Sequence, residues 1–303
     1  MPARFILSFD CEGKWGSADC LTAQHRRDLT DGKLREAYDA ILSLLDEHGI
    51  EATFAFAGLF SQSPAAFAQL KPDVEALAKR APDYLGPALR DMEETGGEGW
   101  HGAALVEAVR AARTAHEIAL HGVTHVPWTQ MDASFVDTEV RLFDKLDGPV
   151  RDSRTFVYPR NLVAHVDALA AGGFVGFRSA RPDRSRLRSL LSEFNVLQRP
   201  EQGPASNGII AIPAGFFLNW RSGARRLVPP AITQMRAKRL LGRAEATGAV
   251  VHYWLHPENI ATAPATLGSL SALLREVAEQ REKGRCTVLT QLGYCAAMGA
   301  HAC

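Results

Sequence analysis

The segment HEIALHGVTH, residues 116–125, contains a short apolar run that ends in two histidines four positions apart. The run from 116 to 121 is typical of a buried strand, and His121 closes it. Neutral imidazoles bind borderline divalent ions such as zinc, and two of them leave coordination positions free for a carboxylate and for solvent or substrate. Because histidines at this spacing also occur on ordinary helices, the pair indicates a metal site only together with residues elsewhere in the chain.

Apolar runs suited to buried strands alternate with helix-like segments throughout the chain. We expect strands at 5–10, 51–58, 116–121, 155–160, 174–179, 208–213, 249–256 and 286–290. We expect helices at 34–48, 64–80, 103–115, 232–247 and 267–283. Asp31 is expected to cap the first helix and Gly49 to end it. A glycine-rich loop covers 96–102, and its role, as a substrate lid or as a subunit contact, stays open.

Strands that alternate with helices in this way predict a parallel sheet. Their number favours an α/β fold of the distorted TIM-like (β/α)7–8 barrel type over an open sheet. Since no low-complexity linker divides the chain, we expect a single domain over residues 1–303.

Catalytic and ligand-binding residues in such barrels lie at the C-terminal ends of the strands. Side chains alternate along a strand, so Asp10 ends the first strand on one face and Glu12 continues that face just past the strand. His121, Arg160 and His256 close the third, fourth and seventh predicted strands. The candidate residues therefore all fall at the edge where a barrel active site is expected.

These residues can support hydrolysis of an amide. A divalent ion held by His121, His125 and one carboxylate of the first strand would lower the pKa of water and polarise a carbonyl. The second carboxylate could take the proton from the attacking water, and His256 could give one to the departing amine.

The composition excludes several other classes of protein. The chain of 303 residues is 46% hydrophobic and 22% charged, as in soluble globular proteins. A formal net charge of zero gives no reason to expect nucleic acid or an anionic membrane as a partner, and no run is apolar enough to span a bilayer. The N-terminus, MPARFILSFD, lacks the features of a signal peptide, so we expect a cytoplasmic protein. The 5 cysteines form no CxxC pair, which favours reduced thiols.

Three motifs resemble those of the polysaccharide deacetylases of the NodB-homology group, carbohydrate esterase family 4. SFDCEG at 8–13 resembles the first motif of the family, usually TFDDG, and HGVTH at 121–125 matches its H-x-x-x-H motif. YWLHPEN at 253–259 resembles the last motif, in which a leucine and a histidine close a strand. The resemblance extends from residue 5 to about residue 259.

The resemblance implies a role for each matching residue. In variants with D-x-E spacing the first acid is the general base and the second binds metal, which implies Asp10 as base and Glu12 as ligand. His121 and His125 would complete the ligand set, and His256 would be the general acid. The implied cofactor is a divalent metal, zinc in the first place, with cobalt, nickel, manganese or iron as alternatives.

The third motif departs from the family pattern. The family commonly has R-x-P-Y, in which the arginine orients the base, whereas this chain has FVYPRN at 156–161. Val157 takes the arginine position and Arg160 the tyrosine position. The peptide N–H of Arg160 could stabilise an oxyanion, and the guanidinium of Arg160 or Arg178 could steady Asp10. The alternative is that both are ordinary strand-end arginines paired with surface acids.

Further residues are candidates for contact with the substrate. Trp254 or Leu255 would form the wall of the acyl pocket, and Trp220 could stack on a sugar, with core packing as its alternative. Tyr158 and Arg178 complete the predicted substrate contacts. By strand parity, His252 is predicted to be a buried, hydrogen-bonded core residue and not a ligand.

The arginines Arg221, Arg225 and Arg226 suggest a phosphate on the substrate, with a solvated helix face as the alternative. The predicted function is a metal-dependent hydrolase that removes an acetyl or formyl group from an amino sugar or sugar conjugate. A hydrolase of a ureide or cyclic imide on the same fold is one alternative, and a carbohydrate-binding barrel without turnover is the other. The expected partner is a small-molecule or glycan substrate, and a homo-oligomer stays open.

Overall fold

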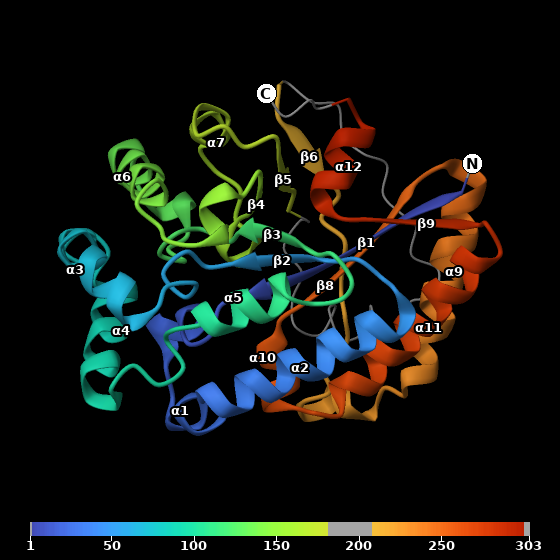
Figure 1. Cartoon of the computed structure of the whole chain (residues 1–303), viewed down its shortest axis with the longest axis horizontal. Helices are drawn as coiled ribbons and strands as arrows, with labels where there is room; N and C mark the ends of the chain where they lie inside the picture. The colour runs from blue at the N-terminus through green and yellow to red at the C-terminus, as the bar shows by residue number, and fades with distance from the viewer. Residues whose placement is uncertain (1, 181–207, 300–303) are drawn as a thin grey trace.

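The computed structural model describes residues 2–180 and 208–299, and its centre is one sheet of parallel strands (Figure 1). The strands are β1 (Ala3–Cys11), β2 (Thr53–Phe56), β3 (Glu117–Leu120), β4 (Thr155–Val157), β5 (Gly176–Arg178), β6 (Ile210–Ile212), β7 (Phe216–Phe217), β8 (Val250–Leu255) and β9 (Cys286–Leu289). Their order is β6-β5-β4-β3-β2-β1-β8-β7, and β9 also pairs with β1. Within the described residues β6 and β7 are the two ends of this order, so the sheet curls as an incompletely closed, distorted TIM-like barrel.

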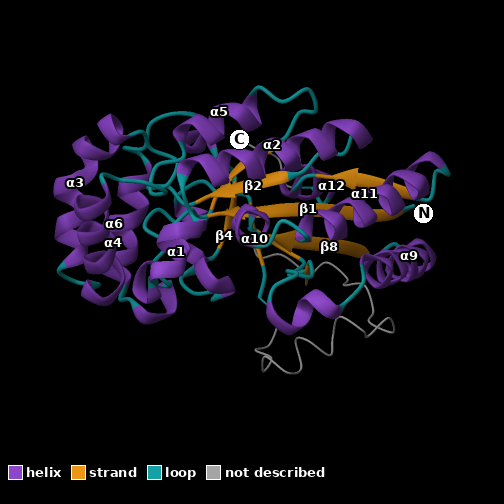
Figure 2. Cartoon of the chain, turned by 90° about the horizontal axis from the view of Figure 1, so that it is seen from below, coloured by secondary structure: helices purple, strands orange, loops and turns teal. Residues whose placement is uncertain are grey.

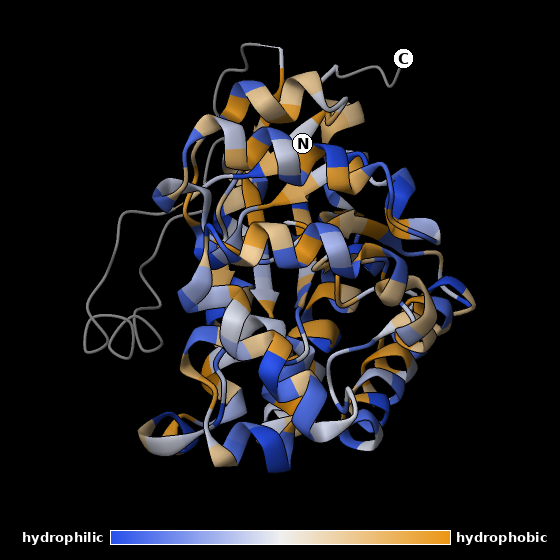
Figure 3. Cartoon of the chain, turned by 90° about the vertical axis from the view of Figure 1, so that its left-hand side faces the viewer, coloured by the Kyte–Doolittle hydropathy of each residue, from blue (hydrophilic) through white to orange (hydrophobic). Residues whose placement is uncertain are grey.

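Helices cover the outer face of the sheet (Figure 2). They are α1 (Ala23–Asp28), α2 (Asp31–His48), α3 (Pro64–Ala78), α4 (Pro82–Thr95), α5 (Ala103–Arg110), α6 (Ala133–Phe143), α7 (Val166–Ala171), α9 (Pro230–Thr247), α10 (Pro257–Thr262), α11 (Thr266–Glu282) and α12 (Gln291–Ala297). The helices α5, α2, α11 and α9 pack against one another in that order. Hydrophilic and hydrophobic residues alternate along the outer helices, as expected when one face packs on a core (Figure 3). No helix in the described part of the chain has the length and apolarity needed to cross a membrane.

Every predicted strand and helix contains an element of the predicted type, but several elements were missed. The helices α1, α7, α10 and α12 have only six or seven residues, too few to show a helical period. The helix α4 contains an internal proline, Pro87, which weakens its pattern. The strand β7 has 2 residues. Elements of two to seven residues are recognised only from their tertiary contacts, whereas α6, which was also missed, is long enough to show a helical period.

The start of α2 differs from the prediction by one residue. The side chain of Thr30, and not that of Asp31, caps the helix by accepting the N–H of Lys33. The carboxylate of Asp31 accepts the N–H of Gly99 instead, at 2.8 Å. Gly49 ends the helix in the left-handed conformation, as expected.

The two faces of β1 have different environments. Phe5, Phe9 and Cys11 belong to the large apolar cluster. On the opposite face, inside the barrel, the hydroxyl of Ser8 lies 2.8 Å from Nε2 of His252. Nδ1 of His252 lies 2.7 Å from the carbonyl oxygen of Pro213, so the prediction of a buried, hydrogen-bonded core histidine is confirmed.

The glycine-rich loop at 96–102 is a packed support for the segment after β1. Trp100 is fully buried, and its ring lies edge-on to Trp15 with centroids 5.1 Å apart. The carbonyl of Gly99 accepts the N–H of Lys14 at 3.0 Å. A Cβ at Gly99 would lie 2.1 Å from the carbonyl oxygen of Leu29, so only glycine fits there.

A buried ion pair joins the same segment to α4. Nζ of Lys14 lies 3.3 Å from Oδ2 of Asp91, and both side chains are 1% exposed. Nε of Arg26 lies 2.5 Å from Oδ1 of Asp91, and the indole of Trp100 donates to Oδ2 at 2.8 Å. Burial raises the pKa of Asp91, but the hydrogen bond from Trp100 and the charge of Lys14 outweigh it, so that the pKa is lowered overall.

We expect Asp91→Ala to lower the free energy of unfolding by about 3–5 kcal/mol, because it leaves the buried ammonium of Lys14 without its carboxylate. Since the folded state lowers the pKa of Asp91, this stabilisation is present above the unfolded pKa and is lost as the pH falls through the folded one. Urea denaturation across the acid range measures both effects. Asp39→Ala, which removes an exposed pair with Arg35, is the control and should change little. Equal effects of the two substitutions would contradict this account.

Candidate metal centre

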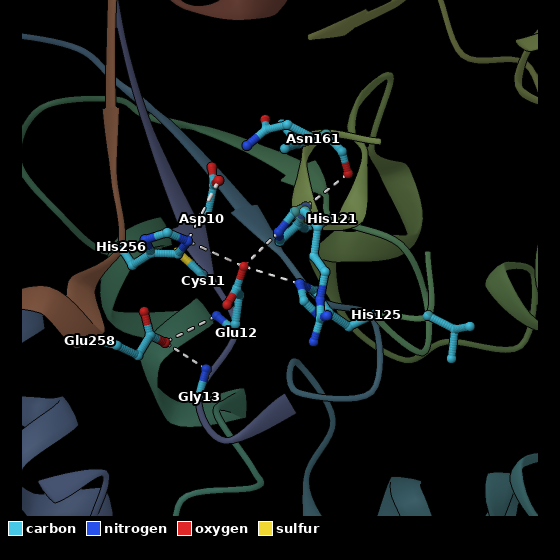
Figure 4. Close-up of polar contacts among 12 residues, drawn as sticks. Asp10, Cys11, Glu12, Gly13, His121, His125, Asn161, His256 and Glu258 are labelled. Atoms are coloured by element: carbon cyan, nitrogen blue, oxygen red, sulfur yellow. Dashed lines mark hydrogen bonds and ion pairs between the residues drawn. The ribbon is translucent and has the colours of Figure 1, made fainter. Parts of the chain in front are cut away.

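Side chains from the C-terminal ends of three parallel strands meet in one place (Figure 4). Asp10 lies in β1, and Glu12 directly follows that strand. His121 follows β3, and His256 follows β8 as the residue that caps α10. His125 completes the group from the turn after His121. Asp10, Glu12, His121, His125 and His256 therefore lie together at the predicted edge.

One oxygen atom is the centre of the group. Oε1 of Glu12 lies 2.8 Å from Nε2 of His121, 3.1 Å from Nε2 of His125 and 3.4 Å from Nε2 of His256. The ligand atoms of Glu12, His121 and His125 all lie within 4.8 Å of one another. Asp10, Glu12 and His256 form a second, overlapping group, whose ligand atoms also lie within 4.8 Å of one another.

The hydrogen bonding of His121 fits a cation at this point. Its Nδ1 lies 2.8 Å from the carbonyl oxygen of Val157, which can only accept, so Nδ1 carries a proton. In the neutral ring, Nε2 then presents a lone pair to Oε1 of Glu12, which is also an acceptor. Two facing acceptors need a proton or a metal ion between them, and two imidazoles with one carboxylate suit zinc.

The charges in the group favour the protonation states that bind metal. Burial raises the pKa of Glu12, but His125 and His256 outweigh it and hold that pKa well below its ordinary value. Burial lowers the pKa of His125, although Glu12 opposes the shift. A charged carboxylate and a neutral imidazole are the forms that coordinate a metal ion.

The loop between the two histidines is held by a buried carboxylate that sequence reasoning missed. Glu139 on α6 accepts the N–H of Thr124 at 2.6 Å and its hydroxyl at 2.5 Å. It also accepts the indole N–H of Trp128. These contacts fix a turn in which His125 has a φ of 62°, a left-handed conformation that costs a non-glycine residue about 1–3 kcal/mol.

Of the two arginines considered for Asp10, Arg178 makes the contact. Its two terminal nitrogens lie 2.7 Å and 2.6 Å from the carboxylate oxygens of Asp10, and both side chains are buried. Arg178 also donates to Oδ1 of Asn161 and lies over the ring of Trp254. Val157 occupies the position of the family arginine and is the partner of Arg178 in the β4–β5 ladder. The guanidinium that contacts Asp10 therefore comes from β5, the strand next to β4. Burial raises the pKa of Asp10, but Arg178 outweighs it and the pKa is lowered.

The guanidinium of Arg160 does not contact Asp10, and the prediction that it could steady this residue is wrong. It pairs with Asp19 and lies over the ring of Tyr84, and it is 36% exposed. The physical reason is that Arg160 has a φ of 57° in the turn after Pro159, which carries the side chain outward. The proposed oxyanion contact from its peptide N–H is a separate prediction.

Two of the predicted substrate contacts lie in the apolar core. Tyr158 is fully buried among aromatic rings, edge-on to Trp128 and Phe177. Leu255 belongs to the apolar cluster on the outer face of the sheet, because side chains alternate along β8. The adjacent Trp254 faces the barrel interior, with its ring 5.7 Å from that of His256.

A cavity of about 360 Å³ opens beside Glu12 and His256. Its lining includes Trp220 and the carboxylate residues Asp28 and Glu258. Among the described residues that line it there is no arginine or lysine. The cavity is therefore better suited to hydroxyl or amino groups than to an anion.

Glu258 and Asn259, which follow His256 in the chain, also belong to the site, and the sequence analysis did not single them out. Oδ1 of Asn259 accepts the N–H of His256 at 3.1 Å and lies 3.2 Å from its Nδ1. Oε1 of Glu258 accepts the N–H groups of Glu12 and Gly13. Burial lowers the pKa of His256, but Glu12 and then Asp10 outweigh it and raise the pKa to about 10. Burial and the charge of Glu12 raise the pKa of Glu258 to about 7.

Comparison with known proteins shows similarity in structure. No protein-family model matches the chain, and the search of curated proteins finds no match. The structure is similar to that of a Mycobacterium smegmatis protein designated a polysaccharide deacetylase, with a TM-score of 0.59, 16% sequence identity and coverage of 97% of this chain and 89% of that chain. A family 4 acetyl xylan esterase from Clostridium thermocellum in complex with a cobalt ion has a TM-score of 0.46 and 13% identity, with coverage of 99% and 93%. A family 4 carbohydrate esterase from Streptomyces lividans in complex with acetate has a TM-score of 0.43 and 12% identity, with coverage of 95% and 92%.

The first of these similarities shows the fold. The chain has the distorted α/β barrel fold of the polysaccharide deacetylases over nearly its whole length, which confirms the predicted fold class. The sequence resemblance is thus accompanied by a similarity of fold. The assignment of Asp10 as base and Glu12 as ligand stays a prediction.

We expect Glu12→Gln to abolish stable zinc binding, because it removes the charged ligand between the two histidines. Asp10→Asn should retain the metal, because Asp10 is not in the predicted ligand set. Metal content after dialysis, measured by elemental analysis, tests both variants, with Asp28→Asn in the neighbouring cavity as the control. Retention of zinc by Glu12→Gln would show that this ligand set is wrong.

We expect Arg178→Gln to lower the free energy of unfolding by about 3–5 kcal/mol, because it leaves Asp10 buried without its counter-charge. Arg160→Gln removes a partly exposed ion pair and should cost only about 0–1 kcal/mol. Chemical denaturation of the two variants measures the difference. A larger loss for Arg160→Gln would contradict the observed pairing.

Proposed function

We propose that the protein is a metal-dependent hydrolase that removes an N-acyl group, acetyl or formyl, from an amino sugar or a sugar conjugate. The observation that carries the proposal is the meeting of two carboxylates, Asp10 and Glu12, with three imidazoles, those of His121, His125 and His256, at the ends of parallel strands. The Mycobacterium smegmatis fold neighbour, designated a polysaccharide deacetylase, is consistent with this class of reaction.

Glu12, His121 and His125 would hold the metal ion. Zinc suits this donor set, and cobalt, nickel, manganese and iron are the alternatives. When bound, such an ion lowers the pKa of water and polarises a carbonyl group.

Asp10 is the proposed general base. Arg178 holds both of its oxygens and lowers its pKa, so the carboxylate is charged and fixed in direction at neutral pH. In the proposed reaction Asp10 takes a proton from the water that attacks the acyl carbon. The peptide N–H of Arg160 is the proposed donor to the oxyanion.

His256 is the proposed general acid. Its raised pKa keeps the ring protonated at neutral pH, and Asn259 holds its orientation. As the C–N bond breaks, His256 gives its proton to the departing amine nitrogen, and the acyl group leaves as a carboxylic acid. Acid and base are thus held in opposite protonation states by their surroundings.

The cavity beside the site supports a sugar substrate. Its carboxylates and its polar lining favour hydroxyl and amino groups, and Trp220 offers a ring on which a sugar could stack. A phosphate would have to bind Arg221, Arg225 or Arg226, which are not among the described residues that line this cavity. The cytoplasmic location and the single-domain extent over 1–303 stay predictions from the sequence, and a homo-oligomer stays open.

We expect the purified protein to release acetate or formate from N-acylated amino sugars when zinc or cobalt is present, and a chelator to stop the reaction. Asp10→Asn and His256→Asn should each lower kcat by about 10²–10⁴-fold, the usual contribution of a general acid or base. Asp39→Asn on the exposed face of α2 is the control.

The choice of substrates separates the alternatives. Release of product from ureides or cyclic imides, but not from acylated sugars, would assign the protein to the other C–N hydrolases. Full activity of Asp10→Asn would show that the assigned base is wrong. If the protein binds sugar but binds no metal and converts none of these substrates, it is a carbohydrate-binding barrel without turnover.

A further inference from the structure

The carboxylate of Glu258 contacts the backbone next to the predicted metal ligand. Glu258 lies in α10, two residues after His256, and is 8% exposed. Its Oε1 accepts the N–H of Glu12 at 3.0 Å and the N–H of Gly13 at 2.5 Å. Figure 4 shows both contacts on the side of Glu12 opposite to Asp10.

The backbone N–H groups of Glu12 and Gly13 point at the same oxygen of Glu258. Successive N–H groups in a turn form a concavity that favours negative charge. Gly13 has a φ of 55°, and a Cβ there would lie 2.4 Å from the ring of Phe60. The acceptor in this concavity is the carboxyl group of Glu258, supplied by the segment that also carries His256.

No strand pairing holds the backbone of Glu12 among the described residues. The β1–β8 ladder ends at the pair Phe9 and Leu255, and the β1–β2 ladder ends at Cys11 and Phe56. Glu12 lies beyond both, although its side chain must meet two histidines from a third strand. The hydrogen bonds that Glu258 accepts from Glu12 and Gly13 take the place of the missing ladder on the β8 side.

We propose that Glu258 is a positioning residue that sets the direction of Glu12 toward His121 and His125 and joins the metal-binding segment to the segment that carries His256. The inference rests on the proposed metal centre, but it concerns a residue outside the ligand set and outside the acid–base pair. A group that orients a ligand in this way commonly affects metal affinity about 10–100-fold.

The test is the zinc affinity of Glu258→Ala and Glu258→Gln, measured by competition with a chromogenic chelator, with the melting temperature recorded for each. Glu258→Ala removes both acceptor contacts and should weaken zinc binding by about 10–100-fold. Glu258→Gln retains one acceptor oxygen and should lie between Glu258→Ala and the unaltered protein. The control is Glu276→Gln, a carboxylate that is 1% exposed in α11 and accepts from Gln280. It should keep the unaltered zinc affinity.

The outcomes separate this inference from the proposed function. If the unaltered protein binds zinc and both Glu258 variants bind it equally well, the inference is overturned while the metal centre stands, even if the melting temperature falls. If the unaltered protein binds no zinc or other divalent ion, both fail. Should Glu258→Ala not fold, Glu258→Gln decides alone, since its shape is almost unchanged. A graded loss of affinity with Glu276→Gln unaffected supports the positioning role.

Discussion

A single carboxylate oxygen, Oε1 of Glu12, faces the Nε2 atoms of His121, His125 and His256 within 3.4 Å. A buried carboxylate is stable only if positive charge and hydrogen-bond donors compensate for the water it has lost. Nδ1 of His121 already lies against the carbonyl oxygen of Val157, so only Nε2 of that ring is free to face Glu12. The remaining structure of the site can be understood as the means of holding these groups at that oxygen.

The sheet and the loops share this task. The parallel strands bring the ends of β1, β3 and β8 to one edge, but their ladders end before Glu12, His121 and His256. Beyond the ladders, buried carboxylates hold the backbone, with Glu139 fixing the turn at Thr124 and Glu258 accepting the N–H groups of Glu12 and Gly13. Glu139 lies on α6 and Glu258 on α10, so the positions of these two helices affect the geometry of the site.

The guanidinium that pairs with Asp10 comes from β5 and not from the β4 position that the resemblance implied. The family motif implied an arginine at Val157, and its absence left the partner of Asp10 open. Val157 and Arg178 are opposite one another in the β4–β5 ladder, so an arginine on the neighbouring strand reaches the same carboxylate. The pair keeps Asp10 charged in a buried place, while Asn161 and Trp254 occupy the other sides of the guanidinium.

The sequence by itself determined the strands other than β7, the faces of β1 and β8, and the meeting of Asp10, Glu12, His121, His125 and His256. These follow from local patterns, since side chains alternate along a strand and parallel strands end at one edge. Only the tertiary structure decided that Arg178 and not Arg160 pairs with Asp10, that Tyr158 and Leu255 are core residues, and that Glu258 and Glu139 support the site. Those outcomes depend on contacts between residues far apart in the chain, such as Glu12 and Glu258, and no local pattern encodes which distant partner a buried charge will find.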